Sequence, residues 1–219
     1  MTFYPTFHGI GEPKRPMEPG EADFWVSIDK FEQVLDLAVR HASNVCITFD
    51  DGNDSDYEIA LPRLVERNLP AIFFVSAAKI GEAGYLSSEQ LHRLATTPGM
   101  SVGSHGMDHV PWPDQNDASL DRELAGSRQL LSEMCGKNVT DAGLPFGRYN
   151  RRVLGRLRSH GYTGIYSSDG SEKLTGLPPI PRESVCEDTD MEWLAAMMRG
   201  AGPIERLRNE ARILVKSLM

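Results

Sequence analysis

Several features that would place this 219-residue chain in a specialised class are missing from its sequence. Its three cysteines, Cys46, Cys135 and Cys186, are too few and too scattered for a disulfide framework or a cysteine-based zinc site. No apolar run approaches the length of a membrane span, and residues 1–16 lack the apolar centre of a signal peptide. We therefore expect a protein without a membrane span, cytoplasmic as the sequence stands, or envelope-associated if a leader has been removed.

The chain also has fewer basic residues, 23, than acidic residues, 31. The formal net charge is −8, and no basic stripe interrupts the acidic balance, which disfavours nucleic acid and anionic membranes as general partners. An apolar content of 40% is ordinary for a globular protein, and the length suffices for one domain with a substantial core. We expect a single domain over 1–219, with a motif-bearing core over about 3–186 and helices over about 190–219. The sequence leaves the oligomeric state open.

Short apolar stretches alternate with amphipathic ones along the chain. The predicted strands are 3–10, 45–49, 71–76, 100–104, 139–144, 163–167 and 180–185. The predicted helices are 29–41, 57–67, 88–95, 117–134, 150–159, 190–199 and one that opens at Pro203, with Ser27, Ser88 and Asn150 as N-caps. Alternating strands and helices favour parallel pairing with right-handed crossovers. Six or seven such units predict an α/β fold, a TIM-like barrel or a distorted relative, in which residues just after each strand meet at one mouth.

The stretch 44–52, NVCITFDDG, joins a predicted buried strand to two adjacent carboxylates. Successive side chains on a strand point to opposite faces, so Asp50 and Asp51 address one spot only if the strand breaks there. Gly52 permits such a break. Two carboxylates this close raise at least one pKa, and a metal ion on one of them would leave the other free as a base. A solvated Asp-Asp-Gly turn is the alternative interpretation.

Two histidines follow the strand predicted over 100–104. His105 and His109, in SHGMDH, are four residues apart, which predicts both imidazoles on one side of a single helical turn, a common way to present two nitrogens to Zn²⁺. Gly106 stands where the zincin pattern requires glutamate, so that motif is excluded. By themselves the two histidines are better explained as a half-buried structural pair, but a neighbouring strand end that carries two carboxylates favours a metal site.

Three ordered motifs resemble the signatures of the NodB-homology polysaccharide deacetylases, carbohydrate esterase family 4. They are TFDDG at 48–52, SH at 104–105 with His109, and LPFG at 144–147. The connecting segments AIFFV at 71–75 and HGY at 160–162 are similar too, and FHGIG at 7–11 is similar to an N-terminal segment in one branch of the family. The resemblance covers most of the chain.

This resemblance implies a distorted (β/α)7 barrel with a divalent metal, expected to be Zn²⁺, held by Asp51, His105 and His109. It implies removal of acetyl groups from N-acetylated sugars or polysaccharide. The ion would lower the pKa of a bound water and polarise the acetyl carbonyl, while Asp50 would take the proton. A backbone N–H near Phe146 is expected to stabilise the oxyanion. The residues of the third motif expected to lie against the glycan are Pro145, Phe146 and Gly147.

Departures from the family pattern fall on the proton-transfer steps. Gly143 occupies the position of the arginine that usually begins the third motif. No histidine follows His160, so the late histidine that many members use as general acid is missing. The acidic fourth motif matches at its start, Asp169, which we expect at the barrel mouth, but Lys173 stands where a tryptophan is expected.

Other residues are candidates for the missing roles. We expect Arg182, on the last predicted strand, to pair with Asp50 and keep it ionised. We expect His8, at the end of the first predicted strand, to reach the same rim as a ligand-binding group or an acid. A strand-end arginine and a structural histidine are the alternative interpretations. Trp112 lies just beyond the metal histidines and is expected to stack on a sugar ring.

Two other functions stay open. A carbohydrate-binding or regulatory domain would keep the metal but lack turnover, as the missing late histidine and Gly143 indicate. A deacetylase of O-acetyl esters or small amides would use the same chemistry on another substrate.

Overall fold

The computed structural model of the protein describes residues 2–170, 175, 178–200 and 202–218; Lys173 lies outside these residues. The strands are β1 Pro5–Phe7, β2 Gly9–Ile10, β3 Trp25–Val26, β4 Ile47–Phe49, β5 Ala71–Val75, β6 Met100–Ser104, β7 Asp141–Gly143, β8 Gly164–Ser167, β9 Ile180–Pro181 and β10 Glu183–Ser184. The helices are α1 Ile28–Arg40, α2 Leu61–Arg67, α3 Ser88–Thr96, α4 Asp117–Asp121, α5 Ser127–Cys135, α6 Arg151–Ser159, α7 Met191–Arg199 and α8 Pro203–Leu218.

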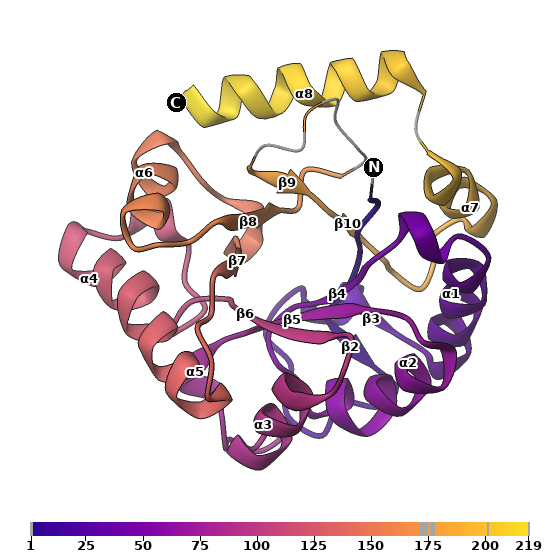
Figure 1. The fold of residues 1–219 in the computed structure, drawn as a ribbon, viewed down its shortest axis with the longest axis horizontal. Helices are drawn as coiled ribbons and strands as arrows, with labels where there is room; N and C mark the ends of the chain where they lie inside the picture. Colours follow the sequence, from indigo (N-terminus) through magenta and orange to yellow (C-terminus); the bar gives the residue numbers. More distant parts are fainter. Residues whose placement is uncertain (1, 171–174, 176–177, 201, 219) are drawn as a thin grey trace.

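The main sheet is parallel throughout and nearly closed into a barrel. Its strand order is β10-β1-β4-β5-β6-β7-β8-β9. The two outer strands of that order, β9 and β10, flank Arg182 within the segment predicted as one last strand, and they pair with β8 and β1 respectively. The Arg182 N–H donates to the carbonyl of Ser167, and the Glu183 N–H donates to the carbonyl of Tyr4. Segment 180–184 therefore joins the two edges of the sheet, and the predicted distorted (β/α)7 barrel is confirmed (Figure 1).

The central strand β5 shows why its sequence is apolar without interruption. Phe73 and Val75 belong to the main hydrophobic cluster, whereas Ile72 and Phe74 belong to a second cluster with Tyr166. Both faces of the strand are therefore covered, as parallel barrel strands require. Helices α1 to α6 surround the barrel, and α8 lies along one side of it (Figure 1). Within the described residues, no helix combines the length and apolar content needed to cross a membrane.

Helix boundaries differ from the predictions in places. Ser27 and Asn150 accept hydrogen bonds as N-caps, but the cap of α3 is Ser87 rather than Ser88. Ser87 exchanges hydrogen bonds with Gln90, whose side chain completes a capping box. The helix predicted over 117–134 is divided into α4 and α5 by a π-helical turn, Arg122–Gly126, and another π-helical turn, Asp56–Ala60, precedes α2.

Replacing Phe73 by alanine tests the packing that holds β4 beside β5. Its ring is fully buried and stacks on that of Phe49, with centroids 4.7 Å apart. We expect Phe73→Ala to lower the free energy of unfolding by about 3–5 kcal/mol, measured by urea denaturation. Val65→Ala on α2 is the control, because Val65 is 47% exposed and its loss should change stability by about 0.5 kcal/mol at most. Equal effects of the two substitutions would contradict this packing.

Candidate metal centre and active site

The two adjacent carboxylates come together because the backbone reverses at the second one. Asp50 follows β4, and its N–H still donates to the carbonyl of Phe7 in β1. Asp51 and Gly52 then adopt φ values of 77° and 82°. The predicted break therefore begins at Asp51 itself, in a region that residues other than glycine seldom adopt. A Cβ at Gly52 would lie 2.8 Å from Val75 Cγ1, so close packing also requires glycine there.

Asp51, His105 and His109 present three donor atoms to one point. One ligand atom from each lies within 4.8 Å of the others. Asp51 Oδ1 is 3.6 Å from His105 Nε2 and 3.3 Å from His109 Nε2, and it is buried without a hydrogen-bond partner. Because the Gly143 carbonyl can only accept, His105 Nδ1, at 3.0 Å, must donate to it, which leaves the Nε2 lone pair facing Asp51. One carboxylate and two imidazoles so arranged fit a divalent cation such as Zn²⁺.

The two histidines do not lie on a helical turn, and that part of the prediction is wrong. Residues 105–111 form a loop, in which Gly106 has φ 86° and His109 has φ 54°. The buried carboxylate of Glu123 accepts hydrogen bonds from the N–H groups of Met107, at 2.8 Å, and Asp108. This loop turns back so that the two imidazole rings stack with centroids 5.1 Å apart.

Burial keeps both imidazoles in the neutral form that binds metals. It lowers the pKa of His105 to about 3 and also lowers that of His109. Burial raises the pKa of Asp51 to about 7, and the charge of Asp50 adds to this rise. Asp51 therefore lacks sufficient positive charge from the protein, and a bound cation would supply it.

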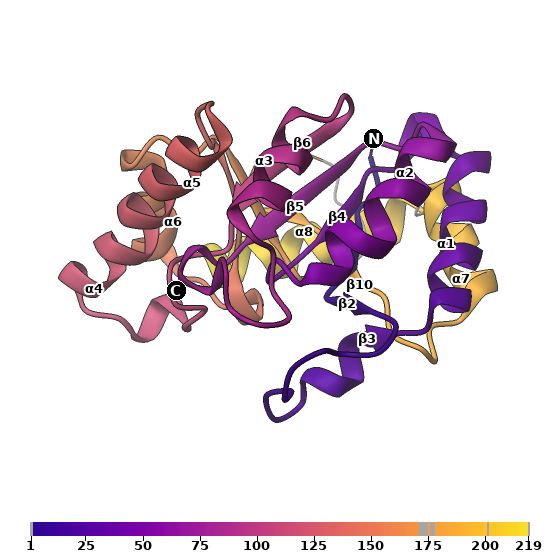
Figure 2. The ribbon, with the colours of Figure 1, turned by 90° about the horizontal axis from the view of Figure 1, so that it is seen from below.

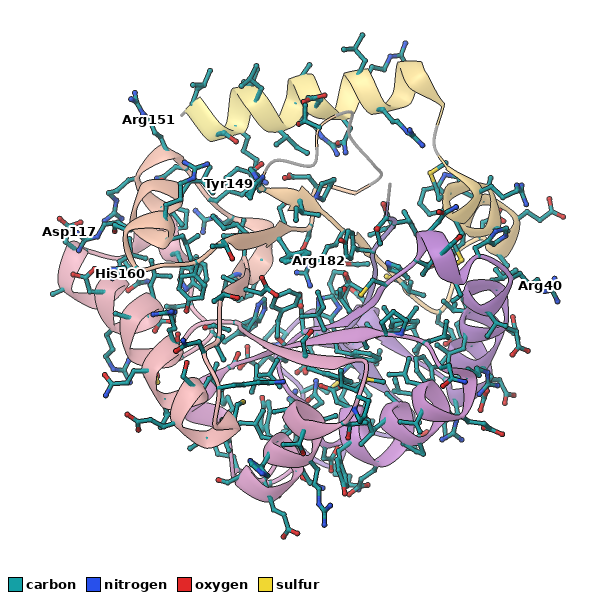
Figure 3. The ribbon with its side chains drawn as sticks, viewed as in Figure 1. Arg40, Asp117, Tyr149, Arg151, His160 and Arg182 are labelled. Atoms are coloured by element: carbon teal, nitrogen blue, oxygen red, sulfur yellow. The ribbon has the colours of Figure 1, made fainter. Side chains whose placement is uncertain are left out.

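Asp50 has its own counter-charge. Arg182 Nη1 and Nη2 donate to Asp50 Oδ1 and Oδ2 at 2.5 and 2.8 Å, and both side chains are buried. Burial opposes ionisation of Asp50, but the charge and hydrogen bonds of Arg182 outweigh it and hold the pKa of Asp50 well below its usual range. The guanidinium also lies over the Phe74 ring, 4.7 Å from its centroid. Figure 3 shows Arg182 near the middle of the barrel, where the expected contact with Asp50 is present.

Gly143 leaves no room for the arginine that usually begins the third motif. A Cβ at this position would lie 2.9 Å from Phe74 Cγ and 3.0 Å from His105 Nδ1. In this chain the arginine beside Asp50 therefore comes from the barrel-closing segment 180–184.

His8 and Phe146 both reach the cavity over this centre, which has a volume of about 560 Å³. His8 lies between β1 and β2, with Nε2 3.9 Å from Asp50 Oδ2. Phe146 has φ 57°, is 56% exposed, and packs its ring 4.5 Å from that of His109. Its neighbours Pro145 and Gly147 are buried, so of these three residues only Phe146 lines the cavity.

Two residues expected at the mouth do not line the cavity. Trp112 is fully buried in a cluster with residues of α4 and α6, so the prediction that it stacks on a sugar is wrong. Asp169 does not line the cavity, because its carboxylate accepts hydrogen bonds from Tyr149 and Ser167 and pairs with Lys216 of α8.

Lys216 also holds the turn of the third motif. Its Nζ donates to the Gly147 carbonyl at 2.6 Å and to Asp169 Oδ1 at 2.7 Å, above the ring of Tyr149. The C-terminal helix therefore supports the turn that presents Phe146 to the cavity.

One wall of the cavity consists of residues that the sequence did not mark as part of a site. The loop between β2 and β3 contributes its residues, which no motif marks; only proline and glycine in 11–20 indicated a loop. Its members at the cavity are Arg15, Glu18, Pro19, Gly20, Glu21 and Phe24, and Lys79 and Tyr85 line the cavity as well.

The site lies at the carboxyl ends of the parallel strands, which is where TIM-like barrels carry their functional residues. The sequence profile of the family described as "Polysaccharide deacetylase" matches residues 39–165, more than half of the chain. The protein therefore belongs to the polysaccharide deacetylase family.

Individual relatives agree with this assignment. A Bacillus subtilis protein described as "Putative polysaccharide deacetylase YxkH" is 32% identical over 128 residues, which are 58% of this chain and 46% of that protein. The chain thus spans less than half of that relative's length. The Streptococcus pyogenes deacetylase PplD, solved in complex with acetate, matches with a TM-score of 0.74 at 23% identity, covering 90% of this chain and 97% of PplD. IcaB from Ammonifex degensii matches with a TM-score of 0.71 at 21% identity, covering 91% and 97% respectively. These two structures establish the likeness in fold.

Removing Arg182 tests the buried ion pair. We expect Arg182→Met to lower the free energy of unfolding by about 3–5 kcal/mol at neutral pH, because Asp50 is left buried without its counter-charge. The loss should be smaller in acid, since burial without Arg182 raises the pKa of Asp50 and protonation then removes the unpaired charge. Urea denaturation of metal-free protein at both pH values measures this.

The double variant Arg182→Met with Asp50→Asn provides the matched control. It should be more stable than Arg182→Met alone, because no unpaired charge remains. A double variant destabilised by the sum of the two single effects would contradict the coupling.

Proposed function

We propose that this protein is a divalent-metal-dependent deacetylase that releases acetate from N-acetylated sugars or polysaccharide. The observation that carries the proposal is the donor set of Asp51, His105 and His109 beside the ionised Asp50, in a chain of the polysaccharide deacetylase family. The acetate held in the PplD complex supports acetate as the product for this fold.

Asp51, His105 and His109 would hold the cation, with Zn²⁺ the expected metal. When bound, such an ion supplies a Lewis acid that acidifies water and polarises a carbonyl. Asp50 accepts the proton of the attacking water in this mechanism. Arg182 fixes both Asp50 oxygens and keeps the carboxylate ionised.

His8 is the proposed acid for the leaving nitrogen. It lines the cavity, and its Nε2 is 3.9 Å from Asp50 Oδ2, so it lies beside the proposed base. The Phe146 N–H is the proposed oxyanion donor. The ring of Phe146 packs against that of His109.

Asp50→Asn tests the proposed base. Zinc-loaded wild type should release acetate from N-acetylglucosamine oligomers, and the variant should lose about 10²–10⁴-fold in kcat while it still binds zinc. His105→Ala should lose the zinc itself, measured by metal analysis of protein purified without added ions. His92→Ala, an exposed histidine on α3, is the control and should keep both properties.

No acetate from metal-loaded protein, with Asp50→Asn indistinguishable from wild type, would refute the proposal. Sugar binding without hydrolysis would identify a binding member of the family instead. Release from O-acetyl esters or small amides alone would keep the chemistry and change the substrate.

His8→Ala tests the proposed acid separately. We expect kcat to fall by about 10²-fold or more for the amide substrate, because the proposed proton donor to the leaving nitrogen is lost. Zinc content should not change. An unchanged kcat would assign His8 a structural role.

A further inference from the structure

Two exposed phenylalanine rings flank the proposed catalytic groups. Phe146 is 56% exposed and its ring contacts that of His109. Phe24 is 38% exposed and its ring lies against His8, with centroids 4.9 Å apart. Both phenylalanines line the cavity that contains Asp50. Each ring therefore packs against a histidine of the site and leaves part of its apolar surface exposed in the cavity.

A chain of pairwise contacts connects the two phenylalanine rings. Phe24 contacts His8, whose Nε2 is 3.9 Å from Asp50 Oδ2. The same Asp50 oxygen is 3.8 Å from His105 Nε2, and the His105 ring stacks on that of His109, against which Phe146 packs. The two phenylalanines are therefore linked through His8, Asp50, His105 and His109, and each ring adjoins a different histidine of the site.

The wall that carries Phe24 is anchored. Phe24 ends the short 3₁₀-helix Glu21–Phe24 in the loop between β2 and β3, which projects beyond one end of the barrel (Figure 2). Arg15 from the same loop pairs with Glu21, donates to Asn53 Oδ1 at 2.8 Å and lies over the Tyr85 ring at 4.3 Å. The loop is therefore tied to the segments that follow β4 and β5, and Phe24 is presented in a fixed position.

Exposed aromatic surface beside polar groups is the chemistry that binds a sugar, because the ring packs on apolar C–H faces while hydroxyl groups stay hydrated. Phe146 adjoins the metal ligands, where the acetylated residue would react. Phe24 adjoins His8 instead, so its ring offers the cavity a second, separate apolar face.

We propose that Phe24 forms a second sugar subsite, which stacks a pyranose ring adjacent to the one being deacetylated. The proposal rests on the proposed function and narrows its substrate to a glycan of at least two residues. The deacetylase would then bind oligosaccharides more tightly than N-acetylglucosamine itself.

Binding to a non-hydrolysing background tests this without turnover. In the zinc-loaded Asp50→Asn protein, calorimetry would measure affinity for N-acetylglucosamine, its β-linked dimer and its tetramer. We expect the oligomers to bind more tightly than the monomer, and Phe24→Ala to weaken tetramer binding by about 10-fold while leaving monomer binding unchanged. Phe24→Trp, which keeps an aromatic face, should retain tetramer affinity. Trp193→Ala on α7 is the matched control, because Trp193 is also 38% exposed but does not line the cavity.

The main alternative is that Phe24 only supports His8. In that case Phe24→Ala in the otherwise wild-type enzyme would lower kcat equally for dimer and tetramer and alter the pH profile, with tetramer affinity unchanged, and this result would overturn the subsite. Equal affinity of wild type for monomer and tetramer would overturn it too.

Failure of the subsite and failure of the proposed function give different results. Chain-length-dependent binding that needs Phe24, without acetate release by the wild type, would keep the subsite and reject the deacetylase activity. Acetate release with no effect of Phe24→Ala on tetramer affinity or KM would keep the deacetylase activity and reject the subsite.

Discussion

The buried ion pair between Arg182 and Asp50 joins the closure of the barrel to the chemistry proposed for its mouth. Arg182 lies between β9 and β10, at the residue where the two edges of the sheet meet, and its guanidinium meets both oxygens of Asp50. This pairing gives the two adjacent carboxylates different pKa values. Asp50 has a counter-charge within the protein and a low pKa, whereas burial raises the pKa of Asp51 to about 7. Carboxylates separated in this way can take different roles, and here Asp51 is the one left for a cation.

Backbone strain is concentrated at the same place. Among the described residues, four that are not glycine have positive φ values: Asp51, Asn68, His109 and Phe146. Asn68 ends α2, a common place for this conformation, but the other three surround the cavity. Each such residue costs on the order of 1–3 kcal/mol, so the surrounding fold must stabilise it. The loop contacts of Glu123 and the contact of Lys216 with Gly147 are the interactions that do so beside His109 and Phe146.

The sequence allowed prediction of the barrel and of the residues that gather at its mouth, because alternation and strand ends are local features. It did not predict how loops turn. The spacing of His105 and His109 indicated the right pair, but a glutamate from a later helix, not a helical turn, shapes their loop. Trp112 follows that loop and folds inward, which depends on the cluster it joins and not on neighbouring residues. Phe24 carried no signal at all, since its position depends on contacts that Arg15 makes with residues distant in sequence.

The residues of the site fall into two groups, those inside and those outside the segment 39–165 that matches the family profile. The matched residues 39–165 contain the three metal-donor residues, Asp50 and Phe146. His8, Phe24, Arg182 and Lys216 all lie outside that range, yet they contact the proposed base, line the cavity or hold the third motif's turn. The matched segment therefore contains the proposed reaction centre, but not Arg182, the proposed acid His8 or the proposed glycan contact Phe24. These groups come from the two ends of the chain, and the fold brings them to the cavity formed around the central motifs.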